Sequence, residues 1–302
     1  MTSISLAAPP GFAAAVQIAA GGEGGRPRLK LAQVQPGEAS AQTRLENMAR
    51  QIQMKRKSVR VLLERSDYQL LQIDAPAVPA EEMKTAVRWQ VKDMLRLPLE
   101  DVTLDVAPPP EASAGGRRAM AYVAAASNDI VRQRMLGFRI FASDVEVIDI
   151  PEMAQRNIAD RLEEPARATA VLSLNAAGCL LTASREGTLY FTRHFDLPGG
   201  LSEKNDERRD QLDKLVLDLQ RSIDVLEHQF SFLSVSTLWL APFAHADELL
   251  ALLIEHLYLP ARLIDLGTLF DCSECSLPAS PAYQAALFPA LGLALRPVGE
   301  AA

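Results

Sequence analysis

The amino-terminal part of the chain has two apolar stretches on either side of a glycine-rich turn. Phe12–Ala19 and residues 28–34 carry the apolar positions, and residues 21–25 between them are Gly-Gly-Glu-Gly-Gly, which predicts a β-hairpin. A phosphate-binding loop is the alternative interpretation. The turn has neither the Lys-Ser/Thr pair of a P-loop nor the spacing of a dinucleotide fingerprint, so a plain turn is favoured.

The clearest helical pattern of the first half follows Pro79. Apolar residues from Met83 to Val91 recur at helical spacing, with charged residues on the other faces. Two further helices are predicted, over residues 39–56 and from Asn128 onward. Strands are predicted over residues 58–63, 68–73, 102–106, 119–126 and 145–150, the first two paired with each other.

The second half repeats this order of strands and helices. A long helix is predicted over residues 207–232, where apolar residues recur in alternating four- and three-residue steps. A coiled-coil partner is the alternative, but the stripe extends over only about three heptads, so packing against the protein's own sheet is favoured. Strands are predicted over residues 168–174, 179–184, 189–195, 236–240 and 261–266, and helices over residues 247–257 and 281–295. Mixed sheets covered by helices, in two similar halves, predict an α/β bilobed fold.

The composition is that of a globular protein, and its charge restricts the partners. The chain has 302 residues, 48% of them hydrophobic and 23% charged, and a net charge of -7. Broad binding to nucleic acid depends on many Lys and Arg contacts with phosphates, so the acidic balance disfavours it. The short basic run at residues 55–57, with Arg60, is interpreted as a solvated turn, with contact to an anionic membrane as the alternative.

Features that would place the chain across a membrane or outside the cell are not found in the sequence. No segment has the roughly 18 to 20 apolar residues that cross a bilayer. Residues 1–11 are apolar, but they lack the basic start and the cleavage site of a secretory leader. We therefore expect a cytoplasmic protein, and the three cysteines fit a reducing compartment.

Residue types that catalyse reactions or bind metals are present, but not in diagnostic arrangements. The four histidines lack metal-binding spacing, and no Gly-x-Ser-x-Gly elbow occurs. Cys272 and Cys275 form a single Cys-x-x-Cys, which we interpret as coincidence because a structural zinc site needs four ligands; a redox or metal role is the alternative. Asp149 and Asp265 at predicted strand ends could bind Mg²⁺, but a capping role is favoured.

One block of the sequence resembles a known family. Residues 70–79, 81–90 and 97–102 combine a polar helix carrying Ala-x-x-Trp with a following Pro-Leu-Glu-Asp and a strand. This block resembles the PilM family of type IV pilus assembly proteins, and it looks closest to the MshI branch, which serves mannose-sensitive haemagglutinin (MSHA) pili. Weaker similarity extends over nearly the whole chain.

The resemblance implies an actin-like, FtsA/PilM-like bilobed fold of mixed sheets flanked by helices, with ATP between the lobes. Residues 1–75 would form subdomain 1A of the first lobe. Residues 76–150 would form the inserted small α/β subdomain 1C. Residues 151–302 would form the second lobe, subdomains 2A and 2B, together with a closing helix of the first lobe.

The nucleotide motifs implied by the resemblance are degenerate in this chain. The first phosphate motif matches residues 16–21, which hold no carboxylate for Mg²⁺, and in the second Ser173 stands where the family has Asp. The adenosine motif matches residues 240–243, without its two glycines. Phosphoryl transfer depends on a metal and dipoles around the phosphates, so we expect a pseudo-ATPase with no catalytic residue, cofactor or metal. The degenerate positions are Ala19, Gly21, Ser173, Asn175, Gly178, Ala241 and Pro242.

By resemblance, the chain is expected to be a cytoplasmic scaffold of MSHA-like type IV pilus biogenesis at the inner-membrane face. Its expected partner is the N-terminal cytoplasmic peptide of a PilN-like inner-membrane protein, docked as an extended segment beside the inserted subdomain. The pilus assembly platform is a second expected partner, and its assembly ATPase is a further candidate. The chain would associate with the membrane peripherally, through these partners. No nucleic-acid partner is expected. The alternatives are an ATP-binding or ATP-hydrolysing actin-like protein and a GspL-like component of type II secretion.

Overall fold

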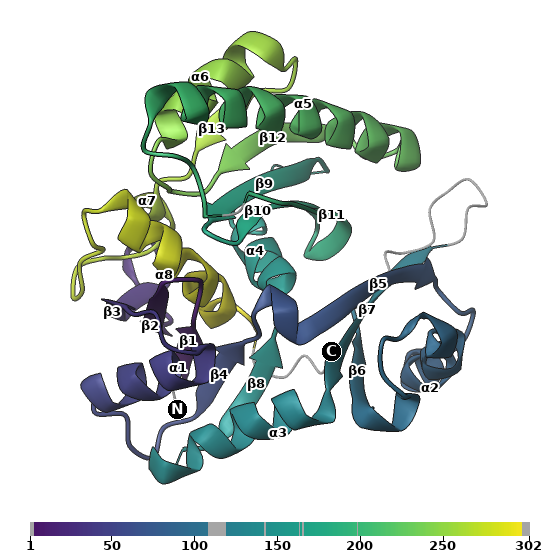
Figure 1. Cartoon of the computed structure of the whole chain (residues 1–302), viewed down its shortest axis with the longest axis vertical. Helices are drawn as coiled ribbons and strands as arrows, with labels where there is room; N and C mark the ends of the chain where they lie inside the picture. Colours follow the sequence, from purple (N-terminus) through teal and green to yellow (C-terminus); the bar gives the residue numbers. More distant parts are fainter. Residues whose placement is uncertain are drawn as a thin grey trace.

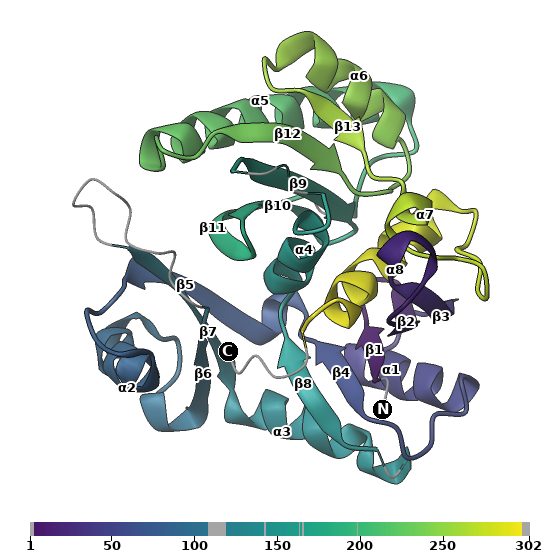
Figure 2. The ribbon, with the colours of Figure 1, turned by 180° about the vertical axis from the view of Figure 1, so that it is seen from behind.

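The computed structural model describes residues 3–107, 119–141, 143–162, 164, 166–197 and 199–297. The segment 108–118, which its Pro, Gly and Ala content predicts to be a loop, lies outside these residues. The described chain forms two five-stranded sheets and one three-stranded sheet, with helices packed on them (Figure 1, and from behind in Figure 2). Among the described helices, none combines the length and hydrophobicity that a membrane span requires.

The two five-stranded sheets have the same strand order. In each, the first three strands along the chain are antiparallel, and the last two lie parallel to the first. This confirms the predicted repetition of one α/β unit. The first sheet has the order β3 (Arg28–Pro36), β2 (Phe12–Ala19), β1 (Ile4–Ala7), β4 (Val59–Leu62), β8 (Val145–Asp149). The second has the order β11 (Thr188–Phe195), β10 (Gly178–Arg185), β9 (Ala168–Asn175), β12 (Val235–Leu240), β13 (Ala261–Leu263).

The first sheet differs from its prediction in two strands. β1, which the sequence pattern leaves inside an apolar start, is the central strand and pairs with β2 and β4. All four of its residues are buried, so no alternation of polar and apolar positions distinguishes it. The predicted pairing of residues 58–63 with 68–73 is wrong. β4 pairs with β1 and β8, whereas β5 (Tyr68–Asp74) joins the third sheet.

The third sheet belongs to a small unit inserted between β4 and β8. Its order is β5, β7 (Met120–Ser127), β6 (Val102–Val106), with antiparallel pairing throughout. The expected subdomain boundary at residue 75 therefore lies after β5, a strand of this small sheet. At the other end of the insertion, β8 belongs to the first sheet.

One face of the small sheet is covered and the other is open. α2 (Ala80–Gln90) contributes Val87, which shares a hydrophobic cluster with Leu71 of β5 and Val123 of β7. α3 (Asn128–Gly137) then carries the chain to β8, as Figure 1 shows. The face opposite α2 borders the groove described below.

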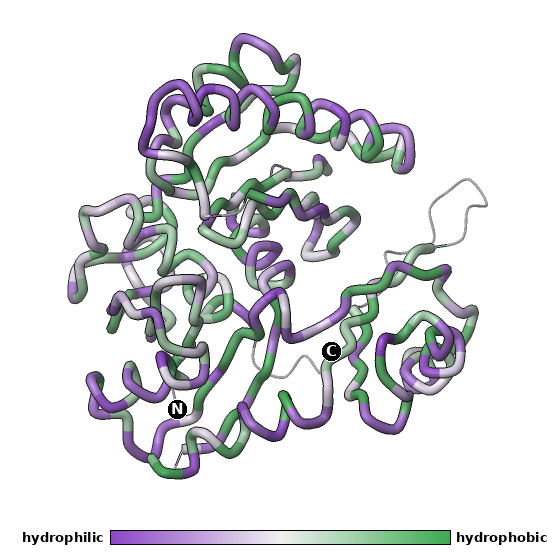
Figure 3. The backbone as a smooth tube through the Cα atoms, viewed as in Figure 1, coloured by the Kyte–Doolittle hydropathy of each residue, from purple (hydrophilic) through white to green (hydrophobic). Residues whose placement is uncertain are grey.

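Amphipathic helices cover the outer faces of the two large sheets. α1 (Ala41–Gln51) buries Leu45 and Met48 against the first sheet. α5 (Asn205–Gln229) and α6 (Ala246–His256) pack on the second sheet, and the apolar stripe of α5 shares one cluster with side chains of β10 and β11. Figure 3 shows hydrophilic and hydrophobic positions alternating along α5. The predicted packing of this helix on the protein's own sheet is confirmed.

Two helices cross each other between the large sheets, and each packs on the sheet that it does not follow in the chain. α4 (Pro151–Ala159) follows the first sheet in the chain but packs on β9 and β10 of the second. α8 (Pro281–Ala294) follows the second sheet and the short α7 (Leu266–Leu269), but packs on β1 and β2 of the first. Both helices belong to a hydrophobic cluster that draws on both sheets, and α8 is apolar on all sides because it is enclosed.

The crossing of α4 and α8 requires a glycine. A Cβ atom on Gly292 would lie 2.1 Å from the backbone oxygen of Ala154, closer than any real contact. The Asn157 side chain also donates from Nδ2 to the Gly292 carbonyl at 3.0 Å. The backbones of the two helices are therefore in direct contact at this point.

We predict that Gly292→Ala destabilises the fold by about 1–3 kcal/mol or more, because the added methyl group forces the helix backbones apart. The midpoint of urea unfolding measures this change. Gly37→Ala is the matched control, since its new Cβ would meet nothing closer than 3.7 Å. Equal midpoints for the two variants would contradict the importance of the crossing.

Candidate functional site

A cleft of about 630 Å³ lies between the two large sheets. One turn from each sheet contributes to its lining: residues 8–11 between β1 and β2, and residues 175–178 between β9 and β10. Pro151 at the start of α4 and Pro289 inside α8 line it as well. We call this cavity the interlobe cleft.

Three of the positions expected at a nucleotide site line the interlobe cleft. Ser173 and Asn175 on β9 and Gly178 at the start of β10 lie there together. Gly178 has a φ of 132°, and a Cβ atom on it would lie 2.3 Å from the backbone oxygen of Phe195. The close approach of β11 therefore explains this glycine without any ligand.

The other four expected positions lie away from the cleft lining. Ala19 ends β2 and Gly21 follows it, at the opposite end of that strand from residues 8–11. Ala241 is buried in the cluster between the sheets, followed directly by Pro242. The turn of the first sheet that lines the cleft, residues 8–11, precedes the stretch 16–21 to which the first phosphate motif corresponds in sequence. The cleft-facing turn at residues 8–11 likewise contains no carboxylate.

Four backbone positions in and beside the two cleft turns have no free N–H group. Pro9 and Pro10 have no N–H group. The N–H of Phe12 donates to the Pro9 carbonyl at 2.9 Å, and the N–H of Ala177 donates to the Asn175 side chain at 2.8 Å. Phosphate groups bind where several backbone N–H groups point at them. None of these four positions therefore offers a free N–H group to a phosphate.

A buried carboxylate joins three parts of the molecule beside the cleft. Glu152 of α4 is fully buried, accepts from the Tyr68 hydroxyl at 2.6 Å and lies 2.9 Å from Nε2 of His194. Tyr68 belongs to β5 of the small sheet and His194 to β11 of the second sheet. Burial first, and the Glu152 charge second, raise the pKa of Tyr68 well above its ordinary value.

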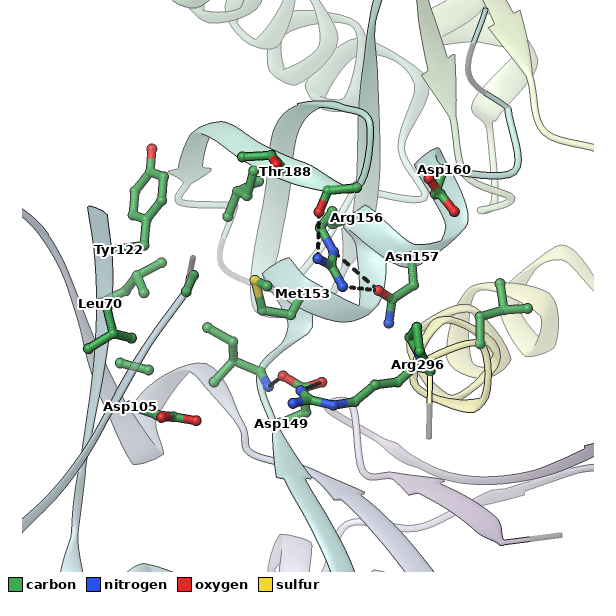
Figure 4. A pocket seen from close by; sticks show the side chains of 18 of the residues that line it. Leu70, Asp105, Tyr122, Asp149, Met153, Arg156, Asn157, Asp160, Thr188 and Arg296 are labelled. Atoms are coloured by element: carbon green, nitrogen blue, oxygen red, sulfur yellow. Dashed lines mark hydrogen bonds and ion pairs between the residues drawn. The ribbon is translucent and has the colours of Figure 1, made fainter. Parts of the chain in front are cut away.

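A second cavity, of about 610 Å³, lies on the open face of the small sheet (Figure 4). We call it the subdomain groove. Its walls come from the small sheet, α4, the turn between β10 and β11, and the residues that follow α8. Leu70, Tyr122, Ala124, Ile148 and Met153 give it an apolar lining.

Charged side chains surround this apolar lining. Arg296 donates from Nη1 to Asp149 at 2.6 Å, and Asp149 also accepts from the N–H of Ile150. Arg156 is held by the Gly187 carbonyl at 2.5 Å and by its neighbour Asn157. Asp149 therefore closes the end of β8 and anchors the chain after α8, in agreement with a structural role. Asp105, Asp160, Arg161 and Glu186 complete the charged lining.

Tyr122 connects the small sheet with an edge strand of the second sheet. Its hydroxyl donates to the Tyr190 carbonyl at 3.2 Å. A hydrogen bond with the Thr192 backbone favours the phenolate, but burial dominates and raises the pKa of Tyr122. β11 is the outermost strand of its sheet. The Tyr122 hydroxyl therefore occupies backbone groups on the edge of this strand that could otherwise pair with another strand.

The described residues contain no group of three or more His, Cys, Asp or Glu side chains that could hold a metal ion. Cys272 and Cys275 are free and partly buried. Asp265, the other candidate for Mg²⁺, accepts from the N–H of Gly267 at 2.9 Å and caps α7. Its arrangement is that of a helix cap.

No family model and no curated protein matches this sequence. Solved structures do match. The chain is 22% identical to one in a structure described as a PilM-PilN type IV pilus biogenesis complex, with a TM-score of 0.71 over 97% of each chain. It is 10% identical to a Bacteroides thetaiotaomicron protein with an actin-like ATPase fold, with a TM-score of 0.51 over 87% of this chain and 90% of that one. This chain has an actin-like fold.

The two lobes of this actin-like chain preserve a short repeat that marks the cleft turns. Residues 4–7 are Ile-Ser-Leu-Ala and residues 172–175 are Leu-Ser-Leu-Asn, and each segment ends at a turn lining the interlobe cleft. Aligning the two halves on this repeat would have identified β1 and its turn. The residues of the subdomain groove have no comparable pattern, because they come from six separate segments.

We predict that Tyr68→Phe lowers the free energy of unfolding by about 1.5–3 kcal/mol at neutral pH, because a buried hydrogen bond to a carboxylate is lost. A second effect appears at high pH. Unfolded tyrosine ionises near pH 10 while folded Tyr68 stays protonated, so wild-type stability falls as pH rises above 10, by up to about 1.4 kcal/mol per pH unit. The variant should lose that part of the slope.

Urea unfolding at several pH values between about 8 and 11 measures both effects of this substitution. Tyr283→Phe, whose ring packs against Phe12, is the matched control and should keep the wild-type slope. An alkaline slope in Tyr68→Phe as steep as in the control would argue against the Tyr68–Glu152 contact.

Proposed function

We propose that this chain is a non-catalytic scaffold of type IV pilus assembly that docks an extended peptide of a PilN-like inner-membrane protein. The observation that carries the proposal is the subdomain groove, with its apolar lining, its charged rim and one wall formed by the inserted small sheet. Extended peptides are recognised by grooves that combine apolar pockets with polar groups. Likeness over the full chain to a structure described as a PilM-PilN complex supports this partner.

We propose further that the interlobe cleft is a degenerate nucleotide site and that the protein is a pseudo-ATPase. The two prolines, the internally bonded N–H groups and the acid-free turn at residues 8–11 support this view. An enzyme of this fold would need groups that place a metal and the phosphates. MSHA-type pili, a position at the cytoplasmic face of the inner membrane and peripheral association through partners are parts of the same proposal.

The division into subdomains follows as a proposal from the sheets. The first sheet, the small inserted sheet and the second sheet correspond to subdomains 1A, 1C and 2A/2B, with α8 closing the first lobe. In this scheme the subdomain groove lies where all three meet. A peptide bound there would contact residues of all three sheets.

Ala124→Arg tests the docking site. The long cationic side chain would fill the groove, so we expect at least a tenfold loss of affinity, about 1.4 kcal/mol, for a peptide covering the cytoplasmic N-terminus of the PilN-like protein. Isothermal titration calorimetry measures the affinity. Ala251→Arg on the exposed face of α6 is the matched control, and thermal unfolding of both variants verifies folding. Affinities within twofold of each other would contradict docking in the groove.

Nucleotide titration tests the interlobe cleft. We expect about 5 mM ATP with Mg²⁺ to leave the melting temperature unchanged and to give no binding heat. A working site with a Kd of about 50 μM would instead stabilise the protein by about 2.7 kcal/mol at that concentration. Saturable binding in the micromolar range, or Mg²⁺-dependent turnover above background, would overturn the pseudo-ATPase proposal and leave the docking proposal untouched.

A further inference from the structure

Two turns far apart in the sequence meet at one corner of the first sheet. Lys55, Arg56 and Lys57 lie exposed between α1 and β4, and the N–H of Arg56 donates to the carbonyl of Phe141 at 3.1 Å. Phe141 ends the 3₁₀ turn Arg139–Phe141, which follows α3. Figures 1 and 2 both show the turn after α1 meeting the turn after α3 at the outer edge of the molecule.

The positive charge at this corner is not neutralised by neighbouring side chains. Among the described residues, none of the exposed cations Lys55, Arg56, Lys57 and Arg139 has an acidic partner. The adjoining Asp144 is exposed, and four cations against this one acid leave three positive charges. The chain as a whole has a net charge of -7, so the corner is a local reversal of sign.

Exposed apolar side chains lie beside these cations. Ile140 is 67% exposed and Leu136, in the last turn of α3, is 45% exposed, whereas Phe138 between them is fully buried. Basic residues near the carboxyl end of a helix are common because they complement its dipole. That explanation does not account for an exposed isoleucine next to Arg139. Cations interleaved with exposed apolar groups are typical of surfaces that lie on anionic lipid.

We propose that this basic corner, formed by Lys55, Arg56, Lys57, Arg139 and Ile140, is a direct contact site for an anionic lipid bilayer. The four cations meet the phosphates of the headgroups, and Ile140 enters the boundary with the acyl chains. A nucleic acid would also attract the cations, but it offers no apolar environment for Ile140.

The position of the basic corner leaves the subdomain groove accessible. β8 starts at this corner, and its far end, at Asp149, lines the groove. Five residues of strand separate the two ends by roughly 15 Å. The chain can therefore lie on a membrane surface while a peptide enters the groove. The inference concerns the chain's own contact with lipid and does not depend on the proposed partner.

Sedimentation of the full chain with lipid vesicles tests the charges. We expect binding to vesicles of phosphatidylglycerol and phosphatidylethanolamine that weakens with added salt, and none to phosphatidylcholine. Lys55→Glu with Lys57→Glu should weaken binding at least about 30-fold, because each cation near an anionic surface contributes about fivefold. Lys214→Glu with Arg221→Glu makes the same charge change on α5 and should bind like the wild type. No wild-type binding, or equal losses in both double variants, would overturn the proposal.

A second pair of variants tests the apolar contact at constant charge. Ile140→Ser should weaken vesicle binding about fivefold, whereas Ile254→Ser, at a similarly exposed isoleucine on α6, should not. Wild-type affinity in Ile140→Ser, or tighter binding to duplex DNA than to the anionic vesicles, would refute the lipid contact. Because the vesicles contain no protein, these results are separable from failure of peptide docking in the groove.

Discussion

The arrangement of the molecule depends on the backbone contact between α4 and α8. Each helix follows one large sheet in the chain and packs on the other, so the two sheets cannot separate without uncrossing the helices. The contact point at Gly292 and Ala154 has no room for a side chain. Both cavities lie along this crossing: Pro151 and Pro289 face the interlobe cleft, while Met153 borders the subdomain groove.

How far the sequence predicted the structure depended on the length and exposure of each element. The apolar stripe of α5 correctly predicted that this helix packs on the protein's own sheet, because a long helix with one apolar face must bury that face. β1 was not found, because its residues Ile4–Ala7 are few and buried on both faces. The turn at residues 8–11 that follows β1 is therefore not part of the predicted first phosphate motif. The sequence predicts a groove beside the inserted subdomain but not the residues that line it. These residues are far apart in the chain, and no local sequence pattern indicates that they lie close together.

The two cavities are similar in size and differ in the groups that line them. In the interlobe cleft, prolines replace hydrogen-bond donors, and Asn175 occupies a further N–H group. In the subdomain groove, an apolar lining is combined with charged groups, some held in place by pairs such as Arg296 and Asp149. The apolar lining and charged groups of the second cavity are the features on which the docking proposal rests.

The groove and the cleft share a set of hydrogen bonds that makes their shapes interdependent. Tyr122 joins the small sheet to β11, and Glu152 joins Tyr68 to His194, which lines the cleft. A hydrogen bond contributes about 1 kcal/mol on average, and more when one partner is charged. Movement of the small sheet away from the second lobe would therefore cost a few kcal/mol. The width of the groove thus follows from packing across all three sheets, and a change in that width would also disturb the contact between Glu152 and His194 beside the cleft.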